Sequence, residues 1–335
     1  MIDQAPPMLL VTRYGKGVKD ERWFRHREHL IGAITVPSLL AQTDPNFTWL
    51  IHIDADMPAS ARARLDEIVR PFGDRVILDT ENRYNNHVLI GIGERLGMVR
   101  DGFLLTGRID DDDAWHVDTV RIVRERAARW IARPDHPPAV VMSFALGYEW
   151  VMYRFYDLDA SKKAGKTVMR DAALRPFKPV EFQGDSVFVV APPALGVSCL
   201  AIAHGKMQGM FRDAGYEVDW MMPETPMWLY TRHKQVSTNI LHGMVTPLEF
   251  RMEELARDFG FDQEGVEDYI AQADDFDYLL EKRTEHRRGL AARELREIDA
   301  AIRNGEATRE MKARREELVR EIDMLANNLV GSVPA

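Results

Sequence analysis

The sequence lacks the features that are typical of disulfide-bonded secreted proteins, of proteins with thiolate-bound metals and of membrane-spanning proteins. Its 335 residues include a single cysteine, Cys199, so the chain can form no internal disulfide and no metal cluster of thiolates. The first residues show no basic segment followed by a long apolar one, and thus no secretory signal. The longest uncharged stretch, residues 186–203, contains Pro192, Pro193 and Gly196, which favours a strand, a turn and a helix start over a membrane span. We therefore expect a soluble, cytoplasmic protein.

The chain also lacks an excess of positive charge. It has 44 lysine and arginine residues against 53 aspartate and glutamate residues, which gives a net charge of −9. Bulk electrostatics therefore favour neither nucleic acid nor an anionic membrane surface as a partner. Hydrophobic residues at 45% and charged residues at 29% are typical of a globular protein, and the length suggests roughly two domains. A phosphate-bearing ligand would have to be held by local cations or by a metal.

The most informative feature that is present is a run of four aspartates, Asp110, Asp111, Asp112 and Asp113, hereafter the aspartate run. It follows directly on residues 103–109, which are mostly apolar and predict a buried strand. Four adjacent like charges repel one another, so the arrangement is costly unless a cation neutralises it. Carboxylate oxygens are hard ligands suited to Mg²⁺ or Mn²⁺, and these ions in turn hold phosphates. The alternative interpretation is a solvated acidic loop.

The first half of the chain alternates apolar runs with helical patterns. Strands are expected at residues 8–11, 48–53, 75–78 and 103–109, and helices at residues 29–41, 59–69 and 85–99. This alternation implies βαβ units, and hence an α/β fold with a mainly parallel sheet flanked by helices, in which ligands bind beyond the carboxyl ends of the strands. Polar residues follow all four strands, namely Thr12 and Arg13, Asp54 and Asp56, Asn82 and Arg83, and the aspartate run. A binding site is therefore predicted at this edge of the sheet.

The second half of the chain predicts a mixed sheet and then a helical extension. Residues 139–144, 150–156, 186–190 and 227–231 are strand candidates, and a helix over residues 202–214 ends at Gly215. Beyond residue 247 the chain is strongly charged, with apolar residues at helical spacing over residues 295–302 and 318–329 and a turn between them. This pattern predicts an antiparallel helical hairpin with a narrow apolar seam. The seam would pack on the main domain or on a second subunit, so that a homodimer through these helices is one option.

Residues 108–113 (RIDDDD) resemble the D-x-D metal motif of GT-A glycosyltransferases. Residues 35–43 (TVPSLLAQT), followed by residues 47–54, resemble a sequence block of the rhamnosyltransferase family, and residues 108–114 resemble its R-x-D-x-D-D-A block. The resemblance spans roughly residues 8–240 and implies a GT-A type, Rossmann-like domain over residues 1–246. Residues 1–115 would form its nucleotide-binding half and residues 116–246 its acceptor half, with residues 247–335 as the helical extension.

The family resemblance implies that the chain is an enzyme that moves a sugar from a nucleotide-sugar donor to a hydroxyl acceptor such as a glycan. Mn²⁺ or Mg²⁺ would stabilise the leaving diphosphate. Side chains two apart in an extended segment project to the same side, which makes Asp110 and Asp112 the natural pair, although the register Asp111 and Asp113 stays open. By resemblance, Asp112 would coordinate the metal and Asp110 would contact the metal through water or the donor ribose. His233 would complete the metal or phosphate site.

The other residues expected to hold the donor lie at the same strand ends. By resemblance, Thr12, Arg13 and Asp54 occupy positions that hold the base and ribose of the nucleotide. Arg83 would contact the diphosphate. Arg108 would pair either with the aspartate run or with the donor.

The catalytic base is less well defined by the sequence. Inverting members of the superfamily present an acidic residue on a helix at a set distance before a Gly-Tyr pair. The pair here is Gly215-Tyr216, and the corresponding position holds His204 instead of a carboxylate. A histidine can remove a proton from a hydroxyl group because its pKa lies near neutrality. Asp219, Asp185 and Glu224 are alternatives, so the base and the stereochemical outcome both stay open.

Two other functions compete with sugar transfer. A metal-dependent nucleotidyltransferase would share the nucleotide-binding α/β sheet and the acidic metal site, but would release pyrophosphate from a nucleoside triphosphate. A non-catalytic assembly protein would act through the helical hairpin and would make no catalytic use of the aspartate run.

Overall fold

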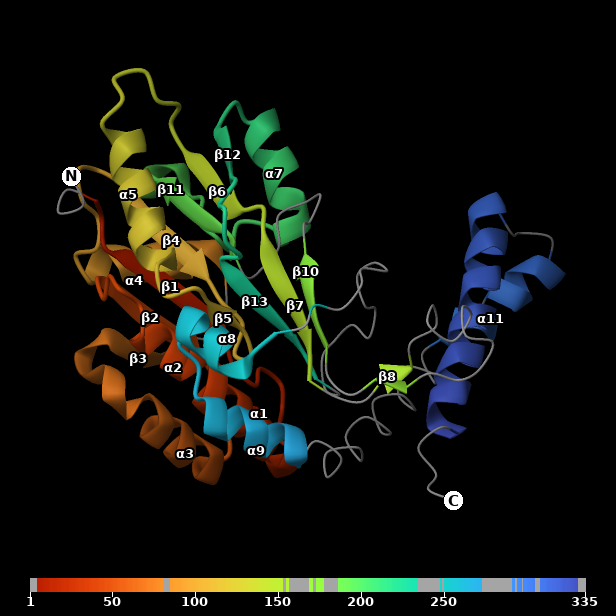
Figure 1. Ribbon diagram of the computed structural model, residues 1–335. Coiled ribbons are helices and arrows are strands. Elements are labelled where there is room, and N and C mark those ends of the chain that lie inside the picture. Colours follow the sequence, from red (N-terminus) through yellow and green to blue (C-terminus); the bar gives the residue numbers. More distant parts are fainter. Residues whose placement is uncertain are drawn as a thin grey trace. The chain divides into compact units, whose positions relative to one another are not determined.

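The computed structural model describes residues 5–80, 85–152, 155–156, 169–170, 173–177, 186–233, 248, 250–272, 291–292, 294–296, 298–304 and 308–330. Contacts divide the chain into two compact units. The first comprises Met1–His233 and Thr238–Ala271, and the second comprises Lys234–Ser237 and Gln272–Ala335. Figure 1 shows the helices and strands of both units, and each unit is described by itself.

A seven-stranded sheet with the order β12-β6-β11-β4-β1-β2-β3 forms the centre of the first unit. Neighbouring strands are parallel except at β11, which is antiparallel to both β4 and β6. Its strands are β1 (Met8–Arg13), β2 (Phe47–His52), β3 (Val76–Asp79), β4 (Leu104–Arg108), β6 (Val140–Phe144), β11 (Phe188–Ala191) and β12 (Glu217–Met221). The predicted α/β fold with a mainly parallel sheet is confirmed.

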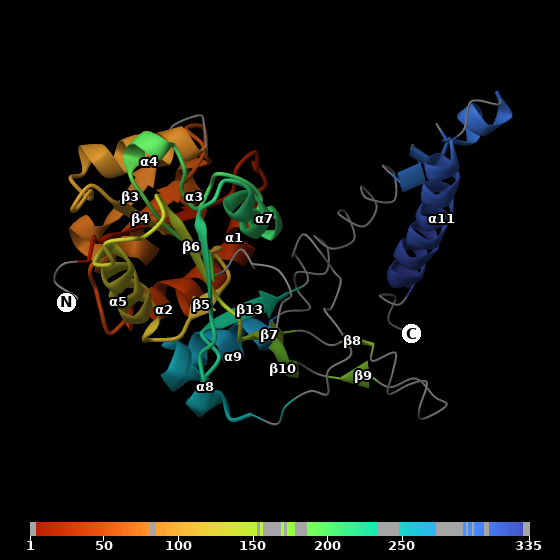
Figure 2. The same cartoon turned by 90° about the horizontal axis from the view of Figure 1, so that it is seen from above.

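Helices cover both faces of this sheet. Apolar residues of α1 (Glu21–Leu30), α2 (Val36–Leu40), α3 (Ala59–Val69) and α5 (Thr119–Ile131) join one buried cluster with alternate residues of β1, among them Leu10. The intervening residues of β1, Leu9 and Val11, pack with α4 (Asn86–Arg95), and α7 (His204–Asp213) packs on Val141 and Val189. Figure 2 shows α4 and α7 on one side of the strands and α2 and α5 on the other. Because these strands are buried on both faces, apolar residues follow one another along each strand without alternating with polar ones.

The helix predicted over residues 29–41 begins eight residues earlier than expected. Asp20 caps α1, since its side chain accepts a hydrogen bond from the backbone N–H of Arg22 at 3.0 Å. A π-helical turn (Ile31–Thr35) connects α1 to α2, whose second residue is Pro37. Further short turns are the 3₁₀ segments Arg70–Arg75 and Pro193–Leu195. The earlier start places Arg27 on the last turn of α1.

A second sheet, with the order β10-β7-β13-β5, lies beside the carboxyl end of β4. It consists of β5 (Ala114–Trp115), β7 (Gly147–Val151), β10 (Ala173–Phe177) and β13 (Trp228–Arg232), while β8 (Phe155–Tyr156) pairs separately with β9 (Met169–Arg170). The strand expected over residues 150–156 therefore belongs to two different sheets. Because β5 directly follows the aspartate run and pairs with β13, the run connects the large sheet to the small one.

Two helices that the sequence analysis placed in the C-terminal extension lie in the first compact unit. The extension was expected to begin at residue 247, whereas α8 (Met252–Phe259) and α9 (Gln263–Ala271) belong to the unit that ends at Ala271. The ring of Phe259 lies 6.0 Å from that of His116, and the hydroxyl group of Tyr269 lies 3.0 Å from His26 Nε2. Charged helical patterns alone do not reveal such long-range contacts.

The second unit contains α11 (Arg309–Val330) and helical residues over 291–303 apart from 293 and 297. Ala291, Ile298 and Leu318 form its buried apolar seam, and Arg315 pairs with Asp299 at 2.7 Å. These contacts join the two helical segments, and part of the turn expected between them lies outside the described residues. Assembly of two copies through this unit stays a prediction. No helix in the described ranges is long and apolar enough to cross a membrane.

Candidate active site at the aspartate run

The carboxyl ends of four parallel strands bring polar side chains together at one edge of the large sheet. The register aligns Arg13 at the end of β1 with His52 of β2, and His52 with Asp79 of β3. On the other side of β1, Val11 pairs with Arg108 of β4, so the aspartate run begins just beyond this edge. Arg13 and the aspartate run are among the strand-end residues named from the sequence, whereas His52 and Asp79 are not. Asn82 and Arg83, expected at the same edge, lie outside the described residues.

Arg27 pairs with two members of the aspartate run, Asp111 and Asp112. Its Nε donates to Asp111 Oδ2 at 2.9 Å, its Nη2 donates to the other oxygen of Asp111, and its Nη1 donates to Asp112 Oδ2 at 3.0 Å. Only 11% of the Arg27 side chain is exposed, and the carboxylates of Asp111 and Asp112 are buried as well. Hydrogen bonds between charged partners are stronger than neutral ones, so this is a firmly paired group.

The aspartate run is a turn and not an extended segment. Asp111 and Asp112 occupy the turn between β4 and β5, so these two neighbours share one guanidinium. The expectation that Asp110 and Asp112 pair because they project to the same side of a strand is therefore wrong in its geometry. Asp110 is partly exposed and accepts from Arg108 Nη2 at 2.9 Å. Thus Arg108 pairs with the run, one of the two roles left open for it.

Asp113 has a structural role. Its Oδ1 accepts from the backbone N–H of Thr231 at 2.8 Å, and its carbonyl oxygen accepts from the hydroxyl group of Thr35 at 3.0 Å. The hydroxyl group of Thr231 also donates to the carbonyl oxygen of Asp112 at 2.7 Å. Asp113 is completely buried, and these contacts join the run to β13 of the small sheet. The alternative register, with Asp111 and Asp113 as the metal-binding pair, is not the arrangement observed.

His233 reaches Asp112 from the end of β13. Its Nε2 lies 2.7 Å from Asp112 Oδ2 and 2.7 Å from Arg27 Nη1. One nitrogen cannot both accept a hydrogen bond from Arg27 and donate one to Asp112. When Nε2 donates to Asp112 Oδ2, that oxygen accepts from both His233 and Arg27. Two of the three predicted metal ligands, Asp112 and His233, are therefore in contact.

Asp111 and Asp112 differ in proton affinity. Burial raises the pKa of Asp111 to about 6, and the opposing effect of Arg27 only partly offsets it. Burial acts in the same direction on Asp112, but Arg27 and His233 outweigh it and hold the pKa of Asp112 well below its usual range. Of Asp111 and Asp112, Asp112 is therefore the one that stays ionised more firmly.

The residues predicted to hold the base and ribose differ in what they contact. Thr12 is fully buried, and its hydroxyl group donates to the carbonyl oxygen of Ile109 at 2.8 Å while accepting from Trp49 Nε1 at 2.9 Å. The structure thus gives Thr12 a role in joining β1 to the start of the run, because a fully enclosed hydroxyl group touches no ligand. Arg13, by contrast, is exposed at the end of β1.

Asp54 binds the loop that follows β1. It pairs with Lys16 at 2.7 Å and accepts from the backbone N–H of Gly17 at 2.5 Å. The hydrogen bond from Lys16 and, to a smaller extent, that from Gly17 lower the pKa of Asp54. Gly17 has a φ of 77°, a conformation that favours glycine. Asp54 therefore shapes the lysine-containing loop at the edge of the sheet.

The two base candidates lie on the acceptor half. His204 is the first residue of α7, and the position of its side chain lies outside the described part of the structure. Asp219 lies on β12, an edge strand of the large sheet, and accepts from Arg126 of α5 at 2.5 and 2.9 Å. Because this carboxylate is held by a bidentate ion pair, it would have to leave Arg126 to accept a proton.

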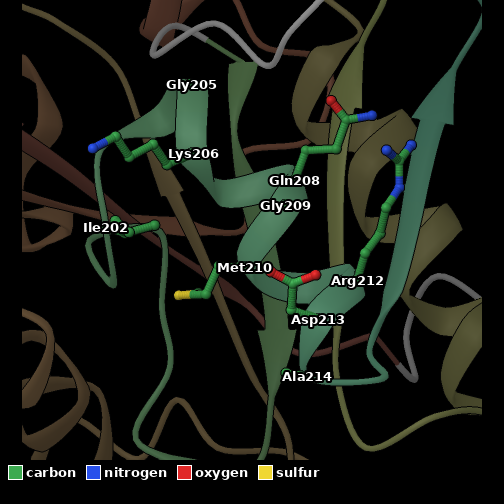
Figure 3. Close-up of a pocket in the computed structure, with 9 residues that line it drawn as sticks. All are labelled: Ile202, Gly205, Lys206, Gln208, Gly209, Met210, Arg212, Asp213 and Ala214. Carbon is green, nitrogen blue, oxygen red and sulfur yellow. The ribbon is translucent and has the colours of Figure 1, made fainter.

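A shallow pocket of about 690 Å³ lies along α7. Figure 3 shows Ile202 and Lys206 toward the start of the helix and Arg212 and Asp213 toward its end. It shares no residue with the aspartate run, but it adjoins the helix end that carries His204. An open surface thus lies beside a base candidate, and the aspartate run forms part of a buried ionic cluster.

The sequence analysis missed Arg27 and a second ionic cluster. Glu149 of β7 accepts from Arg232 Nε at 2.7 Å and pairs with Arg175 of β10, and all three side chains are buried. Arg232 directly precedes His233, so the cluster fixes the end of β13. A single glutamate inside an apolar strand was a signal for a buried ion pair. For Arg27, the signal was a capping aspartate followed by apolar residues at helical spacing.

Whether a divalent ion fits can be judged from the donor set. Carboxylate oxygens and an imidazole nitrogen are the right donors for Mg²⁺ or Mn²⁺. In the ranges that the structure describes, however, no three His, Cys, Asp or Glu side chains converge so that they could hold a metal ion. The Arg27 guanidinium contacts Asp111, Asp112 and His233, so the cation that pairs with these residues in the structure is a side chain of the protein itself.

In open, mainly parallel α/β sheets ligands bind beyond the carboxyl ends of the strands, and the aspartate run lies at that edge. Residues 14–169 match a family model described as "Putative rhamnosyl transferase", which confirms the family resemblance found in the sequence motifs. The match supports a transferase. It includes Asp54, Arg83, Arg108 and the aspartate run, and it leaves out Thr12, Arg13, His204, Asp219 and His233.

Comparison with other proteins adds little detail. No curated protein matches the chain. One similar solved structure is a "Putative Glucose-1-Phosphate Thymidylyltransferase" from Bacillus anthracis, with 10% identity over 66% of this chain and 87% of that chain, at a TM-score of 0.34. Another is a mannose-1-phosphate geranyltransferase from Thermus thermophilus, with 14% identity over 62% of this chain and 60% of that chain, at a TM-score of 0.25. Such distant likeness bears on neither substrate nor mechanism.

Proposed function

We propose that the chain is a glycosyltransferase that moves a sugar from a nucleotide-sugar donor to a hydroxyl acceptor such as a glycan, with a rhamnosyl group as the first candidate sugar. The observation that carries the proposal is the position of the aspartate run. It joins the carboxyl edge of the large sheet to His233 at the end of β13. The family match over residues 14–169 supports transfer of a sugar over the other reactions considered.

The donor would lie along the edge where β1, β2 and β4 end. Arg13 and Arg108 are cations at this edge, and both suit an anionic diphosphate. Asp110, which is partly exposed, can accept a hydrogen bond from the donor ribose. The loop after β1 that contains Lys16 and is held by Asp54 would lie on the nucleotide side of the site. Arg83 is proposed as a further diphosphate contact on sequence grounds alone.

A divalent cation held by Asp112 and His233, with Asp110 or Asp111 completing the set, would stabilise the charge that develops on the leaving diphosphate. The protein contributes the arrangement around it. Thr231 and Thr35 hold the backbone of the run, and the pair formed by Glu149 and Arg232 fixes the residue before His233. Fixed polar groups of this kind need little rearrangement during the reaction.

The base that removes the acceptor proton is proposed to be His204, at the start of α7. Helix α7 packs against β12 and leads into it through a short turn, so its N-terminal end points toward the edge where β12 ends. The pocket along α7 gives an acceptor access to that end of the helix. Asp219 is the alternative base, and it would require Arg126 to release it.

The experiment that tests this function is a hydrolysis and binding screen on the purified full chain. Uridine, thymidine and guanosine diphosphate sugars are incubated with Mn²⁺, with Mg²⁺ or with a chelator, and release of the nucleoside diphosphate is measured. Metal-dependent release from one donor, increased by a hydroxyl acceptor, is the expected result. Pyrophosphate release from a nucleoside triphosphate would instead indicate a nucleotidyltransferase. Absence of both reactions and of nucleotide binding would favour the non-catalytic alternative.

A further inference from the structure

Helix α9 packs against α1 and the turn that follows it. Val266 and Tyr269 of α9 are buried, and the helix contacts both α1 and the π-helical turn Ile31–Thr35. The backbone N–H of Asp262, directly before α9, donates to the carbonyl oxygen of Ala33 in that turn at 2.8 Å. The position of Tyr269 relative to α1 is therefore fixed by side-chain packing and by a backbone hydrogen bond.

Tyr269 reaches His233 through one intermediate ring, that of His26. The Tyr269 hydroxyl group lies 3.0 Å from His26 Nε2, and the centroids of the two rings are 5.6 Å apart. The His26 ring also lies against that of His233, with centroids 5.0 Å apart and an angle of 52° between the planes. His26 and His233 are completely buried. Three elements that are distant in the sequence, α9, α1 and β13, thus bring three rings into contact.

The contact with His26 restricts the orientation of His233. Asp112 and Arg27 both lie 2.7 to 3.0 Å from or beside the same ring atom, since His233 Nε2 is 2.7 Å from each of them. Contacts at one atom still permit an imidazole to tilt about that atom, whereas a second ring packed beside it resists the tilt. The proton or electron pair on Nε2 lies in the plane of the ring, so a tilt changes its direction. His26 therefore controls the direction in which His233 presents Nε2.

We propose that Tyr269 is a positioning residue for His233 and that it acts through His26. This inference rests on the proposed function, in which His233 takes part in the site at the aspartate run. The hydroxyl group of Tyr269 fixes the rotation of the His26 ring, and His26 in turn fixes the tilt of His233. Functional side chains must be held close to one geometry by the groups packed around them. Helix α9 lies beyond residue 169, where the family match ends, so the match assigns Tyr269 no role.

The test uses the full chain with isotope-labelled histidine and compares three variants. Tyr269→Phe removes the hydroxyl group and keeps the ring. Val266→Ala loosens the packing of the same helix but leaves that hydroxyl group in place. Tyr148→Phe removes a hydroxyl group from a half-buried tyrosine whose ring lies 6.1 Å from that of Phe259 in α8. Thermal unfolding establishes the temperature range in which each variant is folded.

Two quantities are measured within that range. Nuclear magnetic resonance records the ring nitrogen signals of His233, identified by their loss in His233→Gln, at one constant pH. Steady-state kinetics give kcat and KM with the donor found in the screen. Loss of stability alone changes neither the signals of the folded state nor kcat, so the two readouts separate positioning from a merely structural role.

We expect Tyr269→Phe to shift the His233 signals and to lower kcat about tenfold, with the KM for the donor within about twofold of that of the unaltered chain. Val266→Ala and Tyr148→Phe should leave both the signals and kcat unchanged. His26→Gln, which replaces the intermediate ring, should reproduce the shift and the lower kcat. If Tyr269→Phe does not fold, His26→Gln decides: shifted signals support the proposal and unchanged signals overturn it.

Unchanged His233 signals or an unchanged kcat in folded Tyr269→Phe overturns the positioning role. An equal shift in Val266→Ala also overturns it, because any loosening of α9 would then have the same effect. If the unaltered chain still releases a nucleoside diphosphate from a donor in these cases, the proposed function stands. Conversely, signals that shift in Tyr269→Phe but not in Val266→Ala, without hydrolysis of any donor by the unaltered chain, support the positioning of His233 and overturn sugar transfer.

Discussion

Thr231 binds the aspartate run through both its backbone and its side chain, although it lies 118 residues from Asp113 in the sequence. Its N–H donates to Asp113 Oδ1 at 2.8 Å, and its hydroxyl group donates to the carbonyl oxygen of Asp112 at 2.7 Å. Every group in these two hydrogen bonds is buried. Thr231 therefore determines where Asp112 lies, and through β13 it determines where His233 meets Asp112.

Replacing Thr231 by valine should destabilise the protein by about 1–3 kcal/mol, because the buried carbonyl oxygen of Asp112 loses its donor while the shape of the side chain is kept. The free energy of unfolding from urea denaturation checks this. Thr225→Val, at an exposed residue of the preceding loop, is the control and should change it by less than about 0.5 kcal/mol. Equal stability of the two variants would contradict the importance of the hydrogen bond.

Gly147 should not tolerate a side chain. A Cβ atom at this position would lie 2.1 Å from the ring of Trp228, which is completely buried. Gly147→Ala should therefore cost at least about 1–3 kcal/mol of stability through overpacking. Gly209→Ala, inside α7 with no atom within 4 Å of the added Cβ, should instead stabilise by about 0.5–1 kcal/mol. Thermal unfolding of both variants measures the contrast, and a destabilised Gly209→Ala would argue against this description of α7.

Cys199 should react slowly with thiol reagents in the folded protein. Burial raises the pKa of the Cys199 thiol to about 12, so at pH 8 the reactive thiolate is about a thousandfold rarer than in the unfolded chain. The rate of reaction with a disulfide reagent, measured at pH 8 with and without denaturant, should differ by at least that factor. Cys199→Ala gives the background rate. Comparable rates in the two conditions would show that the thiol is accessible.

The same pKa shift makes stability depend on alkaline pH. Because the folded pKa of Cys199 is higher than the unfolded one, its contribution to stability is complete below about pH 8.5 and decreases as the pH rises toward 12. Between pH 8 and pH 10 the free energy of unfolding should therefore decrease more steeply with pH for the unaltered chain than for Cys199→Ala. Parallel slopes would mean that the thiol titrates alike in both states.

Asp112→Asn should lower kcat for the proposed sugar transfer by at least about a hundredfold, which corresponds to about 2.7 kcal/mol. The amide keeps an oxygen for Arg27 and occupies the same space, so the fold should persist. Steady-state kinetics with the donor found in the screen measure the effect. Asp66→Asn, at an exposed residue of α3 that pairs with Arg62, is the control and should keep full activity. Retained activity in Asp112→Asn would place the essential carboxylate elsewhere.

Most of the large sheet could be predicted from the sequence because its strands are local apolar runs. The ends of β1, β2 and β4 all lie within two residues of the ends predicted for them, at residues 8–11, 48–53 and 103–109. The small sheet was harder to predict. Its strands pair over long separations, as in the contact between Trp115 and Trp228, and a short strand such as β5 has no periodicity of its own.

For the candidate site, the sequence named residues that meet in the structure but did not show how they meet. Asp112 and His233 were both named as metal ligands, and they are in contact. The pairing of Asp110 with Asp112 was wrong in its geometry, because an extended segment was assumed where the chain makes a turn. Arg27 was missed because the start of α1 was placed too late, and Thr12 was assigned to the nucleotide although its hydroxyl group is enclosed between Ile109 and Trp49.

The sequence by itself determined that an acidic cluster ends the fourth strand of a parallel sheet, since strand periodicity and charge are properties of neighbouring residues. Only the tertiary structure decided what each aspartate does. Arg27 lies 84 residues from Asp111, and His233 lies 121 residues from Asp112. The four aspartates carry the same charge and are neighbours in the sequence, so they differ only in the distant groups that bind them. Their roles therefore depend on the packing of α1 and β13 against the aspartate run.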